Sequence, residues 1–198
     1  MKAIIFDFDG VIHDTLIDLY EVHCETLEKL TLEEMKNNVF NGNPRKYLEK
    51  FTNKEKNDFE KSWNKHYNTL KLKTNIRKEL LLLSKKYLLF IISSNTENNL
   101  NQYFKNNNFT NIFEKIYGVE TDKSKINKFK ILFNEYKLKN DDCIFITDTL
   151  GDILEANNVG LKTIAVEFGF HDKEKLKKGN PFKIISKFEE IKDIVSKI

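Results

Sequence analysis

The sequence has few of the residues on which disulfide-rich, collagen-like or membrane-spanning proteins depend. Its 198 residues include two cysteines, two prolines and seven glycines. Two cysteines are too few for a disulfide framework, and so little proline and glycine excludes collagen-like and Pro/Gly-rich disordered chains. No apolar run approaches the about 20 residues that span a bilayer, and the apolar burst at residues 3–6 is too short for a secretory signal. We therefore expect a soluble, cytoplasmic protein with reduced thiols and no membrane partner.

An excess of charge of one sign is also missing. Lysine and arginine number 33 against 30 aspartates and glutamates, which gives a net charge of +3. A balance this close predicts no nucleic-acid partner. Apolar side chains are plentiful, since 40% of residues are hydrophobic and sixteen are Phe, so the chain can bury a sizeable core. The length suits one domain, or one core with a modest insertion.

Short apolar runs alternate with helical patterns along most of the chain. The runs lie at residues 2–6, 87–92, 112–117, 143–146 and 162–166, with a last strand-and-helix unit at 182–197. The helical patterns between them cover residues 76–86, 97–106, 124–137 and 150–158. Strands that are apolar throughout and alternate with helices are typical of a parallel sheet covered on both faces. The sequence therefore predicts a Rossmann-like α/β fold.

Residues 14–73 interrupt this alternation with helical patterns alone. Apolar residues recur there at helical spacing, as at Phe59, Trp63 and Tyr67. We expect a core domain of residues 1–13 and 74–198, and a small inserted helical cap of residues 14–73. Within the cap, Arg45 is a candidate partner for an anionic group of a substrate.

Acids and hydroxyls follow three of the predicted strands at the point where each strand ends. They are Asp7 and Asp9 after residues 2–6, Ser93 and Ser94 after residues 87–92, and Asp148 and Asp152 after residues 143–146. Ligands of open parallel sheets bind outside the carboxyl ends of the strands, so we expect these side chains on one rim. Oxygen ligands without a His or Cys cluster favour Mg²⁺ over zinc. Mg²⁺ beside carboxylates indicates phosphate chemistry, with Asp7 or Asp9 as a candidate nucleophile.

The motif Asp7-Phe8-Asp9-Gly10-Val11 resembles the first motif of the haloacid dehalogenase superfamily, Asp-x-Asp-Gly-Val/Thr. The order of acid pair, hydroxyl, lysine and second acid pair along the chain is similar too, and the resemblance covers nearly the whole chain. It points to the subclass with a helical cap after the first strand, as in phosphoglycolate phosphatases and β-phosphoglucomutases. The resemblance implies a Mg²⁺-dependent phosphatase that hydrolyses a small phosphorylated metabolite through an aspartyl-phosphate.

The resemblance also implies a role for each acid. Asp7 is similar to the nucleophile, and Asp9 to the general acid and base that protonates the leaving alcohol and then activates water. Asp148 and Asp152 resemble the two acids of the last motif. The implied metal site is formed by Asp7, by Asp9 through its backbone carbonyl, and by Asp148 and Asp152, with Mg²⁺ as the cofactor.

Two neighbouring serines are candidates for the hydroxyl that binds the phosphate. The resemblance implies that Ser93 or Ser94 holds the phosphoryl oxygens. Counting from the preceding helix favours Ser93, whereas Ser94-Asn95 resembles the alternative Ser-Asn form of the motif.

The lysine that neutralises the phosphoryl charge is expected in the turn before the helix at 124–137. Lys123 lies six residues before Phe129, which resembles the family pattern Lys-Pro-x-Pro-x-x-Phe, and Lys125 is the alternative. The chain departs from the family at Ser124, where Pro is usual, and at Thr147, where Gly usually precedes the acid.

Two other interpretations of these motifs compete with a phosphatase. A phosphomutase of the same superfamily uses the same acid pair but returns the phosphoryl group to the sugar. A receiver-like phospho-acceptor domain has similar side chains, but it would carry the acceptor after a middle strand and would lack a helical insertion. The sequence predicts neither the particular substrate nor the oligomeric state.

Overall fold

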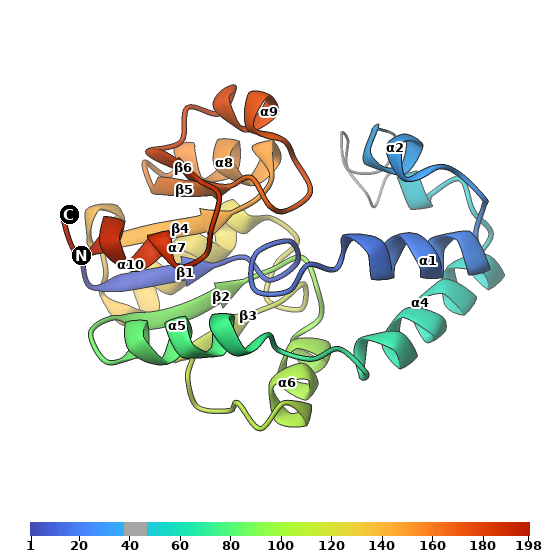
Figure 1. The fold of residues 1–198 in the computed structure, drawn as a ribbon, viewed down its shortest axis with the longest axis horizontal. Helices are drawn as coiled ribbons and strands as arrows, with labels where there is room; N and C mark the ends of the chain where they lie inside the picture. The colour runs from blue at the N-terminus through green and yellow to red at the C-terminus, as the bar shows by residue number, and fades with distance from the viewer. Residues whose placement is uncertain (38–46) are drawn as a thin grey trace. The chain divides into compact units, whose positions relative to one another are not determined.

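Six parallel strands form one sheet in the computed structural model, which describes residues 1–37 and 47–198 (Figure 1). The strands are β1 (Ala3–Phe6), β2 (Leu88–Ile92), β3 (Lys115–Tyr117), β4 (Cys143–Thr147), β5 (Lys162–Val166) and β6 (Lys183–Ile185). Their order across the sheet is β3-β2-β1-β4-β5-β6, and all neighbours pair in parallel. The predicted α/β fold with a parallel sheet is confirmed.

Strand β1 lies at the centre of the sheet, and the chain changes direction there. It runs outward from β1 through β2 to β3, and then returns to place β4 on the other side of β1. Phe6, the last residue of β1, is in register with Ile91 on one side and Ile146 on the other. The segments that follow these three strands therefore leave the same edge of the sheet, at a switch point where α/β proteins bind ligands.

The helices of the described residues have the following bounds. They are α1 (Leu16–Thr26), α2 (Leu32–Met35), α4 (Asn53–Tyr67), α5 (Thr74–Ser84), α6 (Glu97–Asn106), α7 (Lys125–Tyr136), α8 (Leu150–Asn157), α9 (Lys173–Lys177) and α10 (Glu190–Val195). Four of the patterns predicted in the core correspond to α5, α6, α7 and α8 within two residues at each end. Across residues 1–37 and 47–198, no helix combines the length and apolar composition needed to cross a bilayer.

Both faces of the sheet are covered by apolar side chains. On one face, Phe129 of α7 packs edge-on against Phe145 of β4, with ring centroids 5.0 Å apart and both side chains fully buried. On the other face, Phe6 of β1 stacks on Phe188, just before α10, at 5.9 Å. Successive residues of a strand point to opposite faces, so in a sheet that is covered on both faces the central strands β1 and β2 are apolar at every position. This is the physical reason that the strands were visible as continuous apolar runs.

The chain divides into two compact units, one of Met1–Asp14 with Lys71–Ile198 and the other of Thr15–Leu70. The described part of the smaller unit contains helices α1, α2 and α4 and no strand. Within it, His66 of α4 contacts Asp18 of α1, with Nε2 and Oδ1 2.7 Å apart. Trp63 packs edge-on against the buried Tyr67 of the same helix. Arg45 lies outside the described residues.

Phe129→Ala tests the packing between α7 and the sheet. We expect it to lower the free energy of unfolding by about 3–5 kcal/mol, because it removes a fully buried ring and leaves a cavity. The matched control is Ile131→Ala in the same helix, where the side chain is 38% exposed and the loss should stay below about 1 kcal/mol. Urea denaturation followed by circular dichroism measures both, and equal losses would contradict this packing.

Candidate active site

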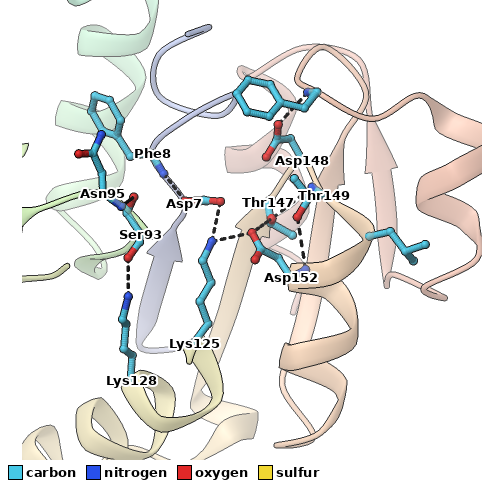
Figure 2. Close-up of polar contacts among 12 residues, drawn as sticks. Asp7, Phe8, Ser93, Asn95, Lys125, Lys128, Thr147, Asp148, Thr149 and Asp152 are labelled. Atoms are coloured by element: carbon cyan, nitrogen blue, oxygen red, sulfur yellow. Dashed lines mark hydrogen bonds and ion pairs between the residues drawn. The ribbon is translucent and has the colours of Figure 1, made fainter. Parts of the chain in front are cut away.

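Asp7 is the first residue after the central strand, and its carboxylate is held from two sides (Figure 2). Oδ1 accepts a hydrogen bond from the backbone N–H of Phe8 at 2.7 Å, and Oδ2 accepts one from Nζ of Lys125 at 2.7 Å. The backbone N–H of Asp7 donates to the carbonyl of Ile146, which extends the pairing of β1 with β4. Burial raises the pKa of Asp7 well above its usual range, and the positive charge of Lys125 opposes that rise.

Lys125 begins helix α7 and joins two carboxylates. Its Nζ lies 2.7 Å from Oδ2 of Asp7 and 2.6 Å from Oδ2 of Asp152, and the side chain is buried. Burial by itself would lower the pKa of Lys125, but the two carboxylates outweigh it and the pKa is raised. A lysine held in this way keeps its charge over the whole range of pH in which proteins work.

The structure separates the two lysines that the sequence left open. Lys123, which the spacing to Phe129 favoured, lies in the turn before α7 and its side chain is exposed. Lys125, the alternative, reaches the carboxylates. The difference arises because the helix begins at Lys125, so the first helical turn carries this side chain to the sheet edge.

Asp152 lies in the first turn of α8 and faces Lys125 (Figure 2). Its Oδ2 also accepts a hydrogen bond from the hydroxyl of Thr147 at 2.8 Å. Burial opposes the ionised form of Asp152. The charge of Lys125 and the hydrogen bonds from Lys125 and Thr147 outweigh this effect, so the pKa of Asp152 is lowered. Thr147, the departure from the family's usual Gly, therefore helps to hold an ionised carboxylate on Lys125.

Asp148 follows β4 directly and is fully buried. Its Oδ2 accepts a hydrogen bond from the backbone N–H of Phe170 at 2.7 Å, whereas Oδ1 is buried and has no hydrogen-bond partner. Burial raises the pKa of Asp148 to about 7. A buried carboxylate oxygen without a donor is costly, and the cost is relieved if a cation or a proton occupies that position.

Glycines bring the loops after β1 and β5 against Asp148. Gly10 has a φ of 76°, and a Cβ built on it would lie 1.9 Å from Oδ2 of Asp148. A Cβ on Gly169 would lie 2.4 Å from Cβ of Asp148 and 2.6 Å from the carbonyl oxygen of Gly10. Only residues without a side chain allow this approach. The loops that follow β1, β4 and β5 therefore meet at one point.

Asp9 lies in the tight turn that follows β1, and its side chain is half-buried. The backbone N–H of Gly10 donates to the carbonyl of His13 at 2.7 Å. The carbonyl of Phe8 accepts from the N–H groups of Val11, Ile12 and His13. These bonds fix the backbone on both sides of Asp9. They therefore restrict the position of its carbonyl group and of the Cα atom from which its side chain extends.

The two serines after β2 differ in burial. Ser93 is fully buried, and its hydroxyl oxygen accepts a hydrogen bond from the backbone N–H of Asn95 at 3.0 Å, whereas Ser94 is exposed. The carbonyl oxygen of Ser93 accepts a hydrogen bond from Nζ of Lys128 at 2.5 Å (Figure 2). No sequence motif includes Lys128, although its position three residues after Lys125 places both on one helix face.

The four acids expected at the metal site have different surroundings. Within residues 1–37 and 47–198, no group of three or more His, Cys, Asp or Glu side chains is arranged to hold a metal ion. Asp152 is engaged by Lys125 and Thr147. Asp148, with its unpaired Oδ1, and Asp7 supply carboxylate oxygens at the same edge, and the backbone carbonyl of Asp9 follows Asp7 by two residues. This all-oxygen set fits Mg²⁺.

The fold and these side chains define an α/β enzyme with its acids at the carboxyl edge of the sheet. Residues 4–166 match the model of the haloacid dehalogenase-like hydrolase family. The match covers most of the chain, so the chain belongs to this family and is a hydrolase. No curated protein is significantly similar to it in sequence.

Solved structures share the fold over nearly the whole chain. A haloacid dehalogenase-like hydrolase from Streptococcus pneumoniae is 22% identical, with a TM-score of 0.87 and 98% of each chain covered. A predicted phosphoglycolate phosphatase from Haemophilus somnus is 17% identical, with a TM-score of 0.81 and 98% of each chain covered. A candidate β-phosphoglucomutase from Thermotoga maritima is 17% identical, with a TM-score of 0.76 and 100% of each chain covered. At these identities the likeness establishes the fold.

Lys125→Met tests the buried ion pairs. The variant leaves Asp7 and Asp152 buried without their cation, so we expect the free energy of unfolding to fall by about 3–5 kcal/mol near neutral pH. The loss should grow as the pH rises above about 4, because the unpaired carboxylates then bind protons more strongly in the folded than in the unfolded chain.

The control for this change is Lys123→Met, which removes an exposed charge two residues away. Surface changes of this kind stay within about 0.5 kcal/mol. Urea denaturation of both variants at about pH 5 and about pH 8 makes the comparison. An equal loss of unfolding free energy in Lys125→Met at both pH values would contradict the predicted contribution of the ion pairs with Asp7 and Asp152.

Proposed function

We propose that the chain is a Mg²⁺-dependent phosphatase that hydrolyses a small phosphorylated metabolite through an aspartyl-phosphate on Asp7. The observation that carries the proposal is the Asp7 carboxylate, held at the end of the central strand between the Phe8 N–H and the Lys125 ammonium. Membership of the hydrolase family supports it.

The proposed reaction has two steps. In the first, a carboxylate oxygen of Asp7 attacks the phosphorus, the bond from phosphorus to the leaving oxygen breaks, and Asp9 gives its proton to that oxygen. In the second, Asp9 takes a proton from water, and the resulting hydroxide attacks the phosphorus. The bond to Asp7 breaks, and inorganic phosphate leaves with both aspartates restored.

Lys125 and Ser93 are proposed to hold the transferred phosphoryl group. The ammonium of Lys125, already beside Asp7, offsets negative charge that the phosphoryl oxygens bring to the site. The Ser93 hydroxyl accepts from the Asn95 N–H and so keeps its own hydrogen for a phosphoryl oxygen. The burial of Ser93 next to this edge favours it over the exposed Ser94.

The residues proposed to hold Mg²⁺ are Asp7, Asp148 and the backbone carbonyl of Asp9. The support is the buried, unpaired Oδ1 of Asp148 and the excess of buried carboxylates over cations around Asp7. When bound, Mg²⁺ supplies positive charge that favours the ionised form of these acids and polarises the phosphoryl group. Asp152, first expected to be a ligand, is assigned to orienting Lys125.

The cap over residues 14–73 stays a prediction, and the compact unit Thr15–Leu70 is its proposed body. A helical unit of this size, inserted after the first strand, is suited to select the substrate and to exclude bulk water during the first step. We place no substrate contact in it.

The proposal is tested with a generic aryl phosphate. We expect the wild type to release phosphate with Mg²⁺ and to lose this activity on removal of the metal by a chelator. Asp7→Asn removes the nucleophile and should lower kcat by at least about 10³-fold.

The matched control is Asp141→Asn, an exposed acid in the short turn before β4. It should leave kcat unchanged. Full activity of Asp7→Asn, or no Mg²⁺-dependent release from any member of a broad panel of phosphorylated metabolites, would refute the proposal. Conversion of a sugar phosphate to its isomer without net phosphate release would identify a phosphomutase instead.

A further inference from the structure

Lys128 is a fully buried cation that the reaction proposed above does not use. It lies on α7, one turn after Lys125, and its Nζ donates to the backbone carbonyl of Ser93 at the end of β2 (Figure 2). The two lysines therefore enter the same edge of the sheet from one helix, Lys125 toward Asp7 and Lys128 toward the loop after β2.

The Ser93 carbonyl needs a hydrogen-bond donor, and that donor need not carry a positive charge. Burying an ammonium costs free energy, because the charge leaves water. A neutral amide or hydroxyl donor would satisfy a backbone carbonyl at lower cost. The charge of Lys128 also contributes to lowering the pKa of Asp122, after the larger effect of hydrogen bonds to that carboxylate. The field of Lys128 is therefore felt at the start of α7.

The hydrogen bond from Lys128 also sets the direction of the next N–H group. In a trans peptide, the carbonyl of one residue and the N–H of the next point in opposite directions. Because the Ser93 carbonyl is turned toward Lys128, the N–H of Ser94 is turned away from α7. The Ser93 hydroxyl is fixed in the same loop by the N–H of Asn95.

We propose that Lys128 is a positioning residue for phosphoryl binding. It holds the Ser93 carbonyl, and it thereby orients the Ser93 hydroxyl and the Ser94 N–H toward a bound phosphate. Its buried charge also strengthens the attraction of this loop for a dianion. The inference rests on the proposed phosphatase function and adds to it a second lysine, which does not touch the phosphoryl group.

The test is the binding of inorganic phosphate to the 198-residue chain with Mg²⁺, by calorimetry and by inhibition of aryl phosphate hydrolysis. Lys128→Met keeps the length of the side chain but removes the donor and the charge. We expect phosphate affinity to fall by about 10- to 100-fold and KM to rise by a similar factor, with a smaller effect on kcat. Lys128→Arg, which keeps the charge, should restore part of the affinity.

Two further variants separate charge from packing. Lys128→Gln removes the charge but retains a neutral donor, so we expect a phosphate affinity between those of Lys128→Met and wild type, and Lys128→Arg against Lys128→Gln isolates the charge if Lys128→Met does not fold. Lys130→Met changes an exposed lysine of the same helix and should leave phosphate affinity unchanged.

The outcomes distinguish this inference from the proposed function. If wild type binds and releases phosphate but a folded Lys128→Met binds it equally well, the role of Lys128 is overturned and the phosphatase stands, whereas wild-type affinity in Lys128→Gln overturns the contribution of the charge. A change in the urea midpoint without a change in phosphate affinity overturns it too. If wild type neither binds phosphate nor hydrolyses any phosphate ester, the proposed function fails first.

Discussion

The ion pairs of Lys125 with Asp7 and Asp152 are the interaction on which the arrangement of the site depends. They join the end of β1, the start of α7 and the start of α8, three segments far apart in the sequence. Two buried carboxylates this close repel each other and would otherwise take up a proton. With Lys125 between them, Asp152 is held as an anion and Asp7 is directed to the edge of the sheet.

Close contact between backbones provides the second constraint. Gly10 and Gly169 let the loops after β1 and β5 approach Asp148 at distances that a Cβ would forbid. The result is a buried carboxylate with one oxygen held by the Phe170 N–H and the other without a donor. At this edge of the sheet, the ammonium of Lys125 therefore compensates Asp7, whereas Oδ1 of Asp148 is left without a donor.

The sequence predicted the sheet well because both of its faces are covered. Strands β1 and β2 are apolar at every position, β4 is apolar up to its last residue, and acids follow β1 and β4, so the parallel fold and the positions of Asp7 and Asp148 could be inferred. Helix α9 was missed, because its five residues are mostly lysine and glutamate and Leu176 alone anchors it. Strand β3 begins later than expected, after a turn in which Asn111 has a φ of 63°.

The side-chain partners within the site were harder to predict. The choice between Lys123 and Lys125 depends on the residue at which α7 begins, and a spacing count does not determine this. The pairing of Asp152 with Lys125 depends on the packing of α7 beside α8, a tertiary contact that no local pattern reports. Lys128 carried no signal of its own, since any one of many lysines is usually solvated, and its burial and its contact with Ser93 are visible in the structure alone.

The central claim is that Asp7 carries the phosphoryl group during the reaction. The direct measurement is to stop a turnover with Mg²⁺ and a phosphate ester by acid, to reduce the protein with borohydride, and to map its peptides by mass spectrometry. Borohydride reduces an acyl phosphate to an alcohol, so the account predicts homoserine at position 7 in protein stopped during turnover, and none in protein stopped without substrate. Phosphate release with an unchanged aspartate at position 7, or reduction at another acid, would contradict it.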